Sequence, residues 1–121
     1  MLRFAVAGLN KEQLAQAIKA AGGDRVSVIA TSDMEAAMLV KTSQADYYLG
    51  ACNTGGGAAL AMAIGILGIT RCATIASNGV LPDAAAIREH IDAGVVAFGV
   101  TVESIEAAAT LVTQILIEQQ G

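Results

Sequence analysis

One run near the middle of the chain carries most of the information: it reads LGACNTGGGAALAMA, from Leu49 to Ala63. Its first residues have the apolar character of a buried strand end, and the uncharged, alanine-rich residues from Gly57 onward are typical of a buried helix. Three successive glycines between them allow positive φ and let a ligand come close to main-chain N–H groups. Because a helix N-terminus carries unpaired donors and a partial positive charge, the run predicts a strand, loop and helix that bind an anion.

Short apolar segments alternate with segments of helical spacing on both sides of this run. We expect strands at 3–8, 25–30, 46–49, 72–76 and 95–99, each followed by a helix. The strands read as continuous apolar runs, which is typical of strands buried on both faces of a parallel sheet. The sequence therefore predicts one α/β domain over residues 1–121. It is a five-stranded parallel sheet with helices on both faces, a flavodoxin-like (Rossmann-like) three-layer sandwich, most simply with the flavodoxin strand order.

Polar residues before two of the helices have the spacing of capping motifs. Asn10 is followed three residues later by Gln13, and Ser32 is followed three residues later by Glu35. Both patterns predict a side chain that accepts a hydrogen bond from the first turn of a helix. The acidic residues at such positions are interpreted as caps rather than as catalytic acids: Asp33, Glu35 and Glu103.

The composition excludes several classes of function. The chain is 55% hydrophobic and 15% charged with a net charge of −4, and its seven basic residues are scattered, so we expect no nucleic-acid partner. The uncharged run from Gly50 to Thr70 is broken by polar residues and glycines, so we expect no membrane span. The opening residues 1–4 lack the basic region, long apolar run and cleavage site of a signal peptide, and Cys52 and Cys72 have no CxxC spacing, so we expect a reduced, cytoplasmic protein.

The helix from Gly57 to about Gly68 is apolar on every side. Such a helix must be covered all round, and monomers rarely expose large apolar patches. We therefore expect a homo-oligomer that forms through this helix, where Gly65 and Gly68 would let two backbones approach closely. The alternative is that the helix is buried within one chain.

In a parallel sheet the carboxyl ends of the strands meet at one edge, where ligands bind. The candidate ligand-binding residues follow the predicted strands at this edge: Gly8, Asn10, Ser32, Cys52, Asn53, Thr54, Gly55, Gly56, Gly57 and Asn78. The loop lacks the Lys of a P-loop, and the first strand is not followed by G-x-G-x-x-G, so no nucleotide cofactor is expected. No cluster of His, Cys or carboxylates has the spacing of metal ligands, so no metal is expected either. The partner we expect is a small anionic metabolite.

Two side chains could take part in catalysis. Cys52 stands just before a helix N-terminus, which favours the thiolate and would let it act as a base or nucleophile; simple packing is the alternative. Cys72 falls inside a strand and is expected in the core. His90 is the one histidine of the chain, and it is either a solvated side chain or part of a site on a neighbouring copy.

Three segments resemble the bacterial YhfU-like family: DMEAAM at 33–38, DYYLGACNTG at 46–55 and VAFG at 96–99. The similarity runs along the whole chain. It implies a bacterial origin and assigns no activity.

The glycine loop also resembles that of the type B ribose-5-phosphate isomerases, which reads Cys-Gly-Thr-Gly-x-Gly after the third strand. The segment REHID at 88–92 resembles their Arg, His and Asp segment before the fifth strand. The resemblance implies that Cys52 is the base, that Thr54 and the amides of Gly55 and Gly57 hold the oxyanion, and that His90 is an acid supplied by a partner. This chain departs from that pattern after the first strand, where Leu9-Asn10 replaces an Asp-His pair. It also lacks the C-terminal arginines that bind phosphate in those enzymes.

These observations leave three hypotheses open. The first is binding of a small anionic metabolite, such as a sugar phosphate, at the Cys52 to Gly57 loop of an oligomer. The second is an aldose-ketose isomerase with Cys52 as general base. The third is a non-catalytic assembly subunit beside a transporter or a metabolic enzyme.

Overall fold

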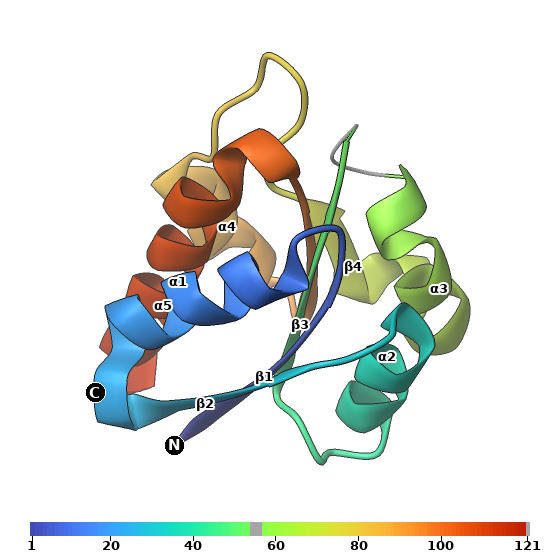
Figure 1. Ribbon diagram of the computed structural model, residues 1–121, viewed down its shortest axis with the longest axis horizontal. Helices are drawn as coiled ribbons and strands as arrows, with labels where there is room; N and C mark the ends of the chain where they lie inside the picture. Colours follow the sequence, from blue (N-terminus) through green and yellow to red (C-terminus); the bar gives the residue numbers. More distant parts are fainter. Residues whose placement is uncertain (54–56, 121) are drawn as a thin grey trace.

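The computed structural model describes residues 1–53 and 57–120, with their side chains except those of residues 57–59. Within these residues, strands and α-helices alternate along the chain (Figure 1). The strands are β1 (Leu2–Gly8), β2 (Val26–Ala30), β3 (Tyr47–Cys52), β4 (Cys72–Thr74) and β5 (Ala97–Thr101). The helices are α1 (Lys11–Gly22), α2 (Asp33–Lys41), α3 (Gly57–Leu67), α4 (Ala84–Asp92) and α5 (Ile105–Gln120). Short 3-10 turns are η1 (Gly23–Arg25), η2 (Ile69–Arg71) and η3 (Val102–Ser104).

The strands form one parallel sheet in the order β2-β1-β3-β5-β4. The predicted fold class, a five-stranded parallel sheet in a flavodoxin-like sandwich, is confirmed. At one edge the order differs from the simple flavodoxin order, in which β4 would lie next to β3. The chain instead leaves β3, forms β4 at the edge, and returns to insert β5 between them. Because this return reverses the direction of the crossover, a right-handed connection places α4 on the opposite face from α3.

The helices form two unequal layers around the sheet. Helices α1, α4 and α5 cover one face, and α2 and α3 cover the other (Figure 1). Alternate residues of β1 point to the two faces, so Phe4 and Val6 join the larger core cluster under α1 and α5. Ala5 and Ala7 join the smaller cluster, which is rich in alanine and lets α2 and α3 lie close to the sheet.

The strand boundaries differ from those predicted at three places. β3 continues through Gly50 and Ala51 to Cys52, so the cysteine is the last residue of a strand rather than part of the turn. β4 ends at Thr74, two residues earlier than predicted, and β5 begins and ends two residues later than predicted. As a result Cys52 and Thr101 lie opposite each other in the β3–β5 register, at the carboxyl edge of the sheet.

Helix α3 is covered only in part within one chain. Leu60 and Ala63 are buried against the sheet and α2, whereas Ala61 and Gly65 are exposed. A Cβ built at Gly65 would meet no atom within 4 Å, so this side of the helix is open. In the described part of the chain, no helix has both the length and the apolar character needed to cross a membrane.

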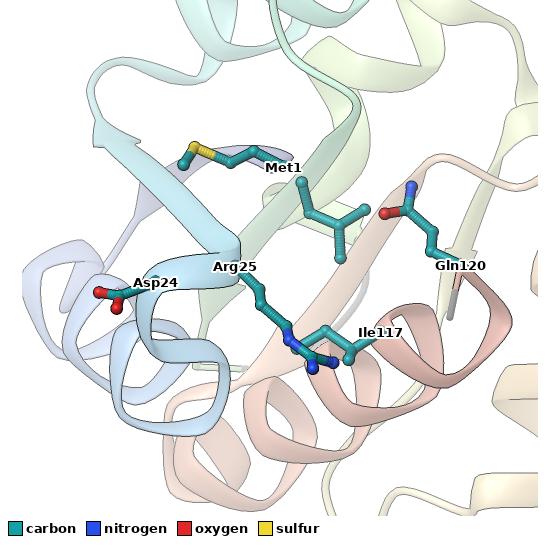
Figure 2. Close-up of a pocket in the computed structure, with 6 residues that line it drawn as sticks. Met1, Asp24, Arg25, Ile117 and Gln120 are labelled. Atoms are coloured by element: carbon teal, nitrogen blue, oxygen red, sulfur yellow. The ribbon is translucent and has the colours of Figure 1, made fainter.

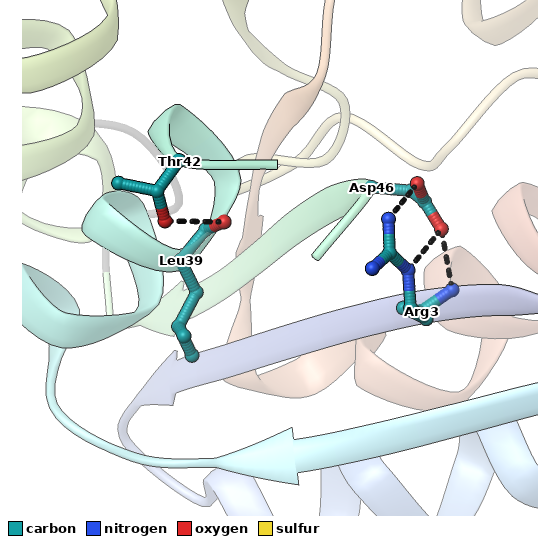
Figure 3. A network of polar contacts seen from close by, with 4 residues as sticks. All are labelled: Arg3, Leu39, Thr42 and Asp46. Atoms are coloured by element: carbon teal, nitrogen blue, oxygen red, sulfur yellow. Dashed lines mark hydrogen bonds and ion pairs between the residues drawn. The ribbon is translucent and has the colours of Figure 1, made fainter. Parts of the chain in front are cut away.

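At the amino edge of the sheet, Arg3 of β1 and Asp46 before β3 form a forked ion pair (Figure 3). The Arg3 side chain donates to both carboxylate oxygens, with Nη2 3.0 Å from Oδ1 and Nε 3.2 Å from Oδ2. The Arg3 backbone N–H also donates to Oδ2 at 2.8 Å, and the Asp46 N–H donates to the Arg3 carbonyl at 2.7 Å. These bonds, led by the side-chain ones, hold the pKa of Asp46 below its ordinary value.

Candidate functional site

The carboxyl edge of β3 lies at the centre of the sheet. Its neighbour β1 is followed by α1 on one face, while β3 is followed by α3 on the other. Neighbouring strands whose connections leave to opposite faces open a crevice, which is where doubly wound sheets bind ligands. Cys52, which is 7% exposed, ends β3 at this crevice, and α3 begins at Gly57 just beyond it.

Gly8 ends β1 opposite Ala51 in the β1–β3 register. Its φ is +88°, and a Cβ built there would lie 2.3 Å from the Ala51 carbonyl oxygen. The next residue, Leu9, donates its backbone N–H to that same oxygen at 2.9 Å. The glycine therefore allows the chain to turn away from β1 while it stays close to β3.

The predicted turn after β4 is confirmed and is tied to the end of β3. Ser77 and Val80 exchange backbone hydrogen bonds of 3.1 and 2.9 Å, and Gly79 has the positive φ of +77° that a tight turn of this kind requires. Between them, the Asn78 amide is oriented, from its hydrogen-bonding environment, with its nitrogen toward two acceptors. That nitrogen donates to the backbone carbonyl of Asn53 at 3.2 Å and to Glu103 Oε1 at 3.2 Å.

Asn78 therefore links Glu103 to the end of β3, a contact that the interpretation of Glu103 as a cap did not include. Glu103 lies in η3, where the preceding Thr101 is the N-terminal boundary residue and makes no side-chain capping bond. The carboxylate accepts from Asn78, and the two bonds of Asn78 connect the turn after β4 to Asn53 after β3 and to Glu103 after β5. The sequence signal that could have found Glu103 is its position directly after the carboxyl end of the last strand.

A hollow of about 290 Å³ lies beside this junction. Residues of the 77–81 turn and of the segment after β5 line it: Ser77, Gly79, Val80, Leu81, Thr101, Glu103 and Ser104. Thr101 is 1% exposed and Ser104 8% exposed, so their hydroxyls are held in fixed positions by the surrounding protein. Three hydroxyls and a carboxylate share the lining with the apolar side chains of Val80 and Leu81.

Lys11, which was not among the site residues predicted from the sequence, places a positive charge at the carboxyl edge of the sheet. It is the first residue of α1, and its Nζ lies 3.4 Å from the carbonyl oxygen of Thr31, which follows β2. An ammonium at this place favours an anionic guest. The sequence signal that could have identified Lys11 is its position in the first turn of the helix that follows the first strand.

Asn10 and Ser32 lie on the β1 and β2 side of the edge. Ser32 caps α2 as predicted, with Oγ accepting from the Glu35 N–H at 3.1 Å. The capping prediction for Asn10 is wrong: the residue is left-handed, with φ of +55°, and its side chain makes no capping bond. The Asn10 amide donates to Gln13 Oε1 at 3.3 Å instead, while the backbone carbonyl accepts from the first turn of α1.

His90 and Cys72 lie away from the end of β3. His90 is half-buried on α4 and lines a separate hollow of about 140 Å³ with Thr74, Ser77 and Asp83. Strand β5 lies between β3 and β4, so one chain does not bring His90 to Cys52. Cys72 is half-buried at the start of β4, not in the deep core, and its Sγ donates to the Gly68 carbonyl at 3.4 Å. Burial raises the pKa of the Cys72 thiol, which disfavours a reactive thiolate.

A further hollow of about 400 Å³ lies at the opposite, amino edge of the sheet. Figure 2 shows Met1, just before β1, together with Arg25 of η1 and with Ile117 and Gln120 of α5, around this hollow. None of the predicted site residues lines it. It shares no lining residue with the carboxyl edge.

The structure thus brings Asn53 and Asn78 together, places Cys52 beside them at the end of β3, and leaves Ser32 and His90 apart. Thr54, Gly55 and Gly56 lie outside the described residues, and Gly57 is described as the first residue of α3. Over residues 1–53 and 57–120, no three His, Cys, Asp or Glu side chains gather in a way that could hold a metal ion.

Solved structures share this fold. The chain is similar to the type B ribose 5-phosphate isomerase of Trypanosoma brucei, with a TM-score of 0.70 and 15% identity over 96% of this chain and 85% of the other. It is also similar to ribose-5-phosphate isomerase B of Giardia lamblia, with a TM-score of 0.66 and 21% identity over 94% of each chain. At these identities the likeness establishes the common fold.

Relatives in sequence are much closer. The uncharacterized protein YhfU of Escherichia coli K12 is 46% identical over 108 residues, which is 89% of this chain and 92% of the relative. YhfU of Shigella flexneri matches to the same extent. The resemblance to this family is therefore confirmed. A family model described as "Protein of unknown function DUF2620" matches residues 2–116, and the chain belongs to that family.

Proposed function

We propose that this protein binds a small anionic metabolite, with a sugar phosphate as the best-fitting class, at the carboxyl edge around the Cys52 to Gly57 loop. The observation that carries the proposal is the junction at Asn53, whose carbonyl is tied through Asn78 to Glu103 just before the N-terminus of α3. A helix start beside a crevice supplies N–H donors and a partial positive charge. Lys11 adds a positive charge on the same edge.

The likeness to solved proteins supports the sugar-phosphate class. Proteins of the same fold are named as ribose 5-phosphate isomerases, and the likeness covers 94–96% of this chain. Their ligand class has an anionic end and a hydroxylated end, and the edge described above offers both cationic and hydroxyl-bearing groups.

The second candidate function is an aldose-ketose isomerase with Cys52 as general base. The observation that favours it is the position of Cys52 as the last residue of β3, almost buried and directly before the segment that leads into α3. A base in such a place has the water-excluded setting that proton transfer needs. His90 would then have to come from a second copy, because β5 separates it from Cys52 within one chain.

Assembly through α3 remains part of the proposal. Ala61 and Gly65 leave an apolar side of this helix uncovered, and a second copy would bury it. If the protein is a tight oligomer that binds no metabolite, the assembly-subunit hypothesis takes precedence.

The experiment is a thermal-shift and calorimetric titration with inorganic phosphate, ribose 5-phosphate and uncharged ribose. A ligand at 100 times its Kd stabilises the fold by about 2.7 kcal/mol, which raises Tm by about 10 °C for a domain of this size. We expect this rise with the two phosphates and not with ribose. Lys11→Met should weaken phosphate binding by about tenfold, whereas Lys19→Met, in the last turn of the same helix, should leave it unchanged.

Turnover separates the two candidate functions. Aldose-ketose interconversion of the bound sugar phosphate is followed by NMR in the wild type, in Cys52→Ser and in the control Cys72→Ser. Loss of turnover by about 10²–10⁴ in Cys52→Ser, with binding retained, would establish the isomerase. Binding without turnover supports the metabolite-binding function, and absence of any phosphate-dependent shift contradicts both.

A further inference from the structure

We propose that the hollow between the 77–81 turn and η3 is a subsite that takes the uncharged, hydroxyl-bearing end of the ligand and rejects a second anionic group. The proposal rests on the proposed function, because it assumes that the anionic end binds on the β1 and β3 side of the same edge. It assigns Thr101 and Glu103 as the residues that determine specificity. Neither was among the site residues predicted from the sequence.

The chemistry of the lining supports a hydroxylated guest. Ser77, Thr101 and Ser104 contribute hydroxyls, each of which can donate and accept a hydrogen bond. Thr101 is 1% exposed and does not use its hydroxyl to cap η3, so the group is held in a fixed position on the wall of the hollow. A site built to pair with ligand hydroxyls discriminates strongly against analogues that lack them.

The negative charge in the lining disfavours binding of a second anionic group. The Glu103 carboxylate lines the hollow, and the residues that line it with Glu103 include no Lys or Arg. Although Glu103 is exposed, its carboxylate repels a second anion that is brought within a few ångströms of it. A phosphate or carboxylate on this end of the ligand is therefore disfavoured, whereas ligand hydroxyls can donate to the carboxylate.

The Asn78 amide connects the subsite to the end of β3. The Asn78 side-chain nitrogen donates both to Glu103 Oε1 and to the Asn53 carbonyl oxygen, each at 3.2 Å. The two acceptors are therefore neighbours, because both lie within hydrogen-bonding distance of the same atom. A ligand of a few carbon atoms can therefore have its hydroxyls beside Glu103 and its charged group beside the end of β3.

The experiment compares three probes by calorimetry: inorganic phosphate, ribose 5-phosphate and ribulose 1,5-bisphosphate. In the wild type we expect ribose 5-phosphate to bind at least about tenfold more tightly than phosphate, and the bisphosphate to bind more weakly than ribose 5-phosphate. Thr101→Val removes one hydroxyl at nearly constant volume and should abolish most of that advantage without changing phosphate binding. Thr101→Ser keeps the hydroxyl and should restore it.

Glu103→Gln keeps the acceptor for Asn78 and removes the charge, so it should strengthen bisphosphate binding by about tenfold. The control is Glu106→Gln, which removes an equivalent charge from the exposed first turn of α5, outside the hollow. If ribose 5-phosphate keeps its advantage in Thr101→Val and the bisphosphate gains nothing in Glu103→Gln, the subsite is overturned while the anion site stands. If neither phosphate nor ribose 5-phosphate binds the wild type, the proposed function itself fails, and the subsite with it.

Discussion

The carbonyl oxygen of Ala51 occupies the space where a side chain at Gly8 would begin: a Cβ built there lies 2.3 Å from it. The two residues are partners in the β1–β3 register, so the contact is set by the sheet itself. Because backbone atoms cannot move aside without loss of strand pairing, the close approach requires glycine at this position.

Gly8→Ala should therefore lower the free energy of unfolding by about 3 kcal/mol or more, from the clash and from the strain of φ near +88° together. Gly94→Ala is the matched control, since Gly94 has a φ of +96° but nothing within 4 Å of its built Cβ. It should cost about 1–2 kcal/mol from strain alone. Urea unfolding measures both, and equal losses in the two variants would show that the clash is relieved.

The Arg3–Asp46 fork should make stability depend on acidity. The pKa of the Asp46 carboxyl is lowered in the folded protein. As the pH falls, this carboxyl is therefore protonated in the unfolded chain before it is protonated in the folded one. The stabilisation is fully present above the ordinary carboxyl pKa of about 3.9 and is lost as the pH falls through the lower native value. Asp46→Asn should lose this part of the pH dependence, whereas Glu89→Gln, on the exposed surface of α4, should follow the wild type. Urea unfolding between about pH 2.5 and 6 tests this, and parallel curves for wild type and Asp46→Asn would contradict it.

Thr113 in α5 is fully buried, and its hydroxyl has no hydrogen-bond partner among the described residues. A buried polar group without a partner costs about 1–3 kcal/mol. Thr113→Val replaces the hydroxyl with a methyl group of similar size and should raise the free energy of unfolding by about 1 kcal/mol. Thr110→Val, half-buried on the same helix, should change it by less than about 0.5 kcal/mol. A destabilised Thr113→Val variant would mean that the hydroxyl does have a partner in solution.

Ser32 stabilises α2 through the bond from the Glu35 N–H to its Oγ at 3.1 Å. Ser32→Ala leaves that donor without its partner and should cost about 1 kcal/mol. Ser32→Asp, which caps as well as Ser, should retain the wild-type stability. Thermal unfolding of the three proteins measures the difference, and an unchanged Ser32→Ala variant would show that water replaces the cap.

Local pattern was sufficient for the order of elements, the parallel sheet with helices on both faces, the cap at Ser32 and the turn at Ser77–Gly79. Each of these depends on residues close together in the chain: apolar runs for strands, helical spacing for helices, and turn or cap residues at their ends. Local sequence pattern did not predict the left-handed conformation of Asn10 or the absence of its capping bond. The conformation at the end of β1 depends on a contact with β3, in which the Leu9 N–H donates to the Ala51 carbonyl.

The tertiary structure alone decided which strands are neighbours, and with that what meets at the carboxyl edge. β5 lies between β3 and β4 in the sheet, so Thr101 lies opposite Cys52, and β5 is buried along its whole length whereas β4 is not. The pairing of Asn78 with Glu103 follows from this order, since it joins loops that are distant in sequence. Hydrophobic pattern along a strand reports how deeply the strand is buried, whereas the identity of its neighbour is set by packing among segments that the pattern does not connect.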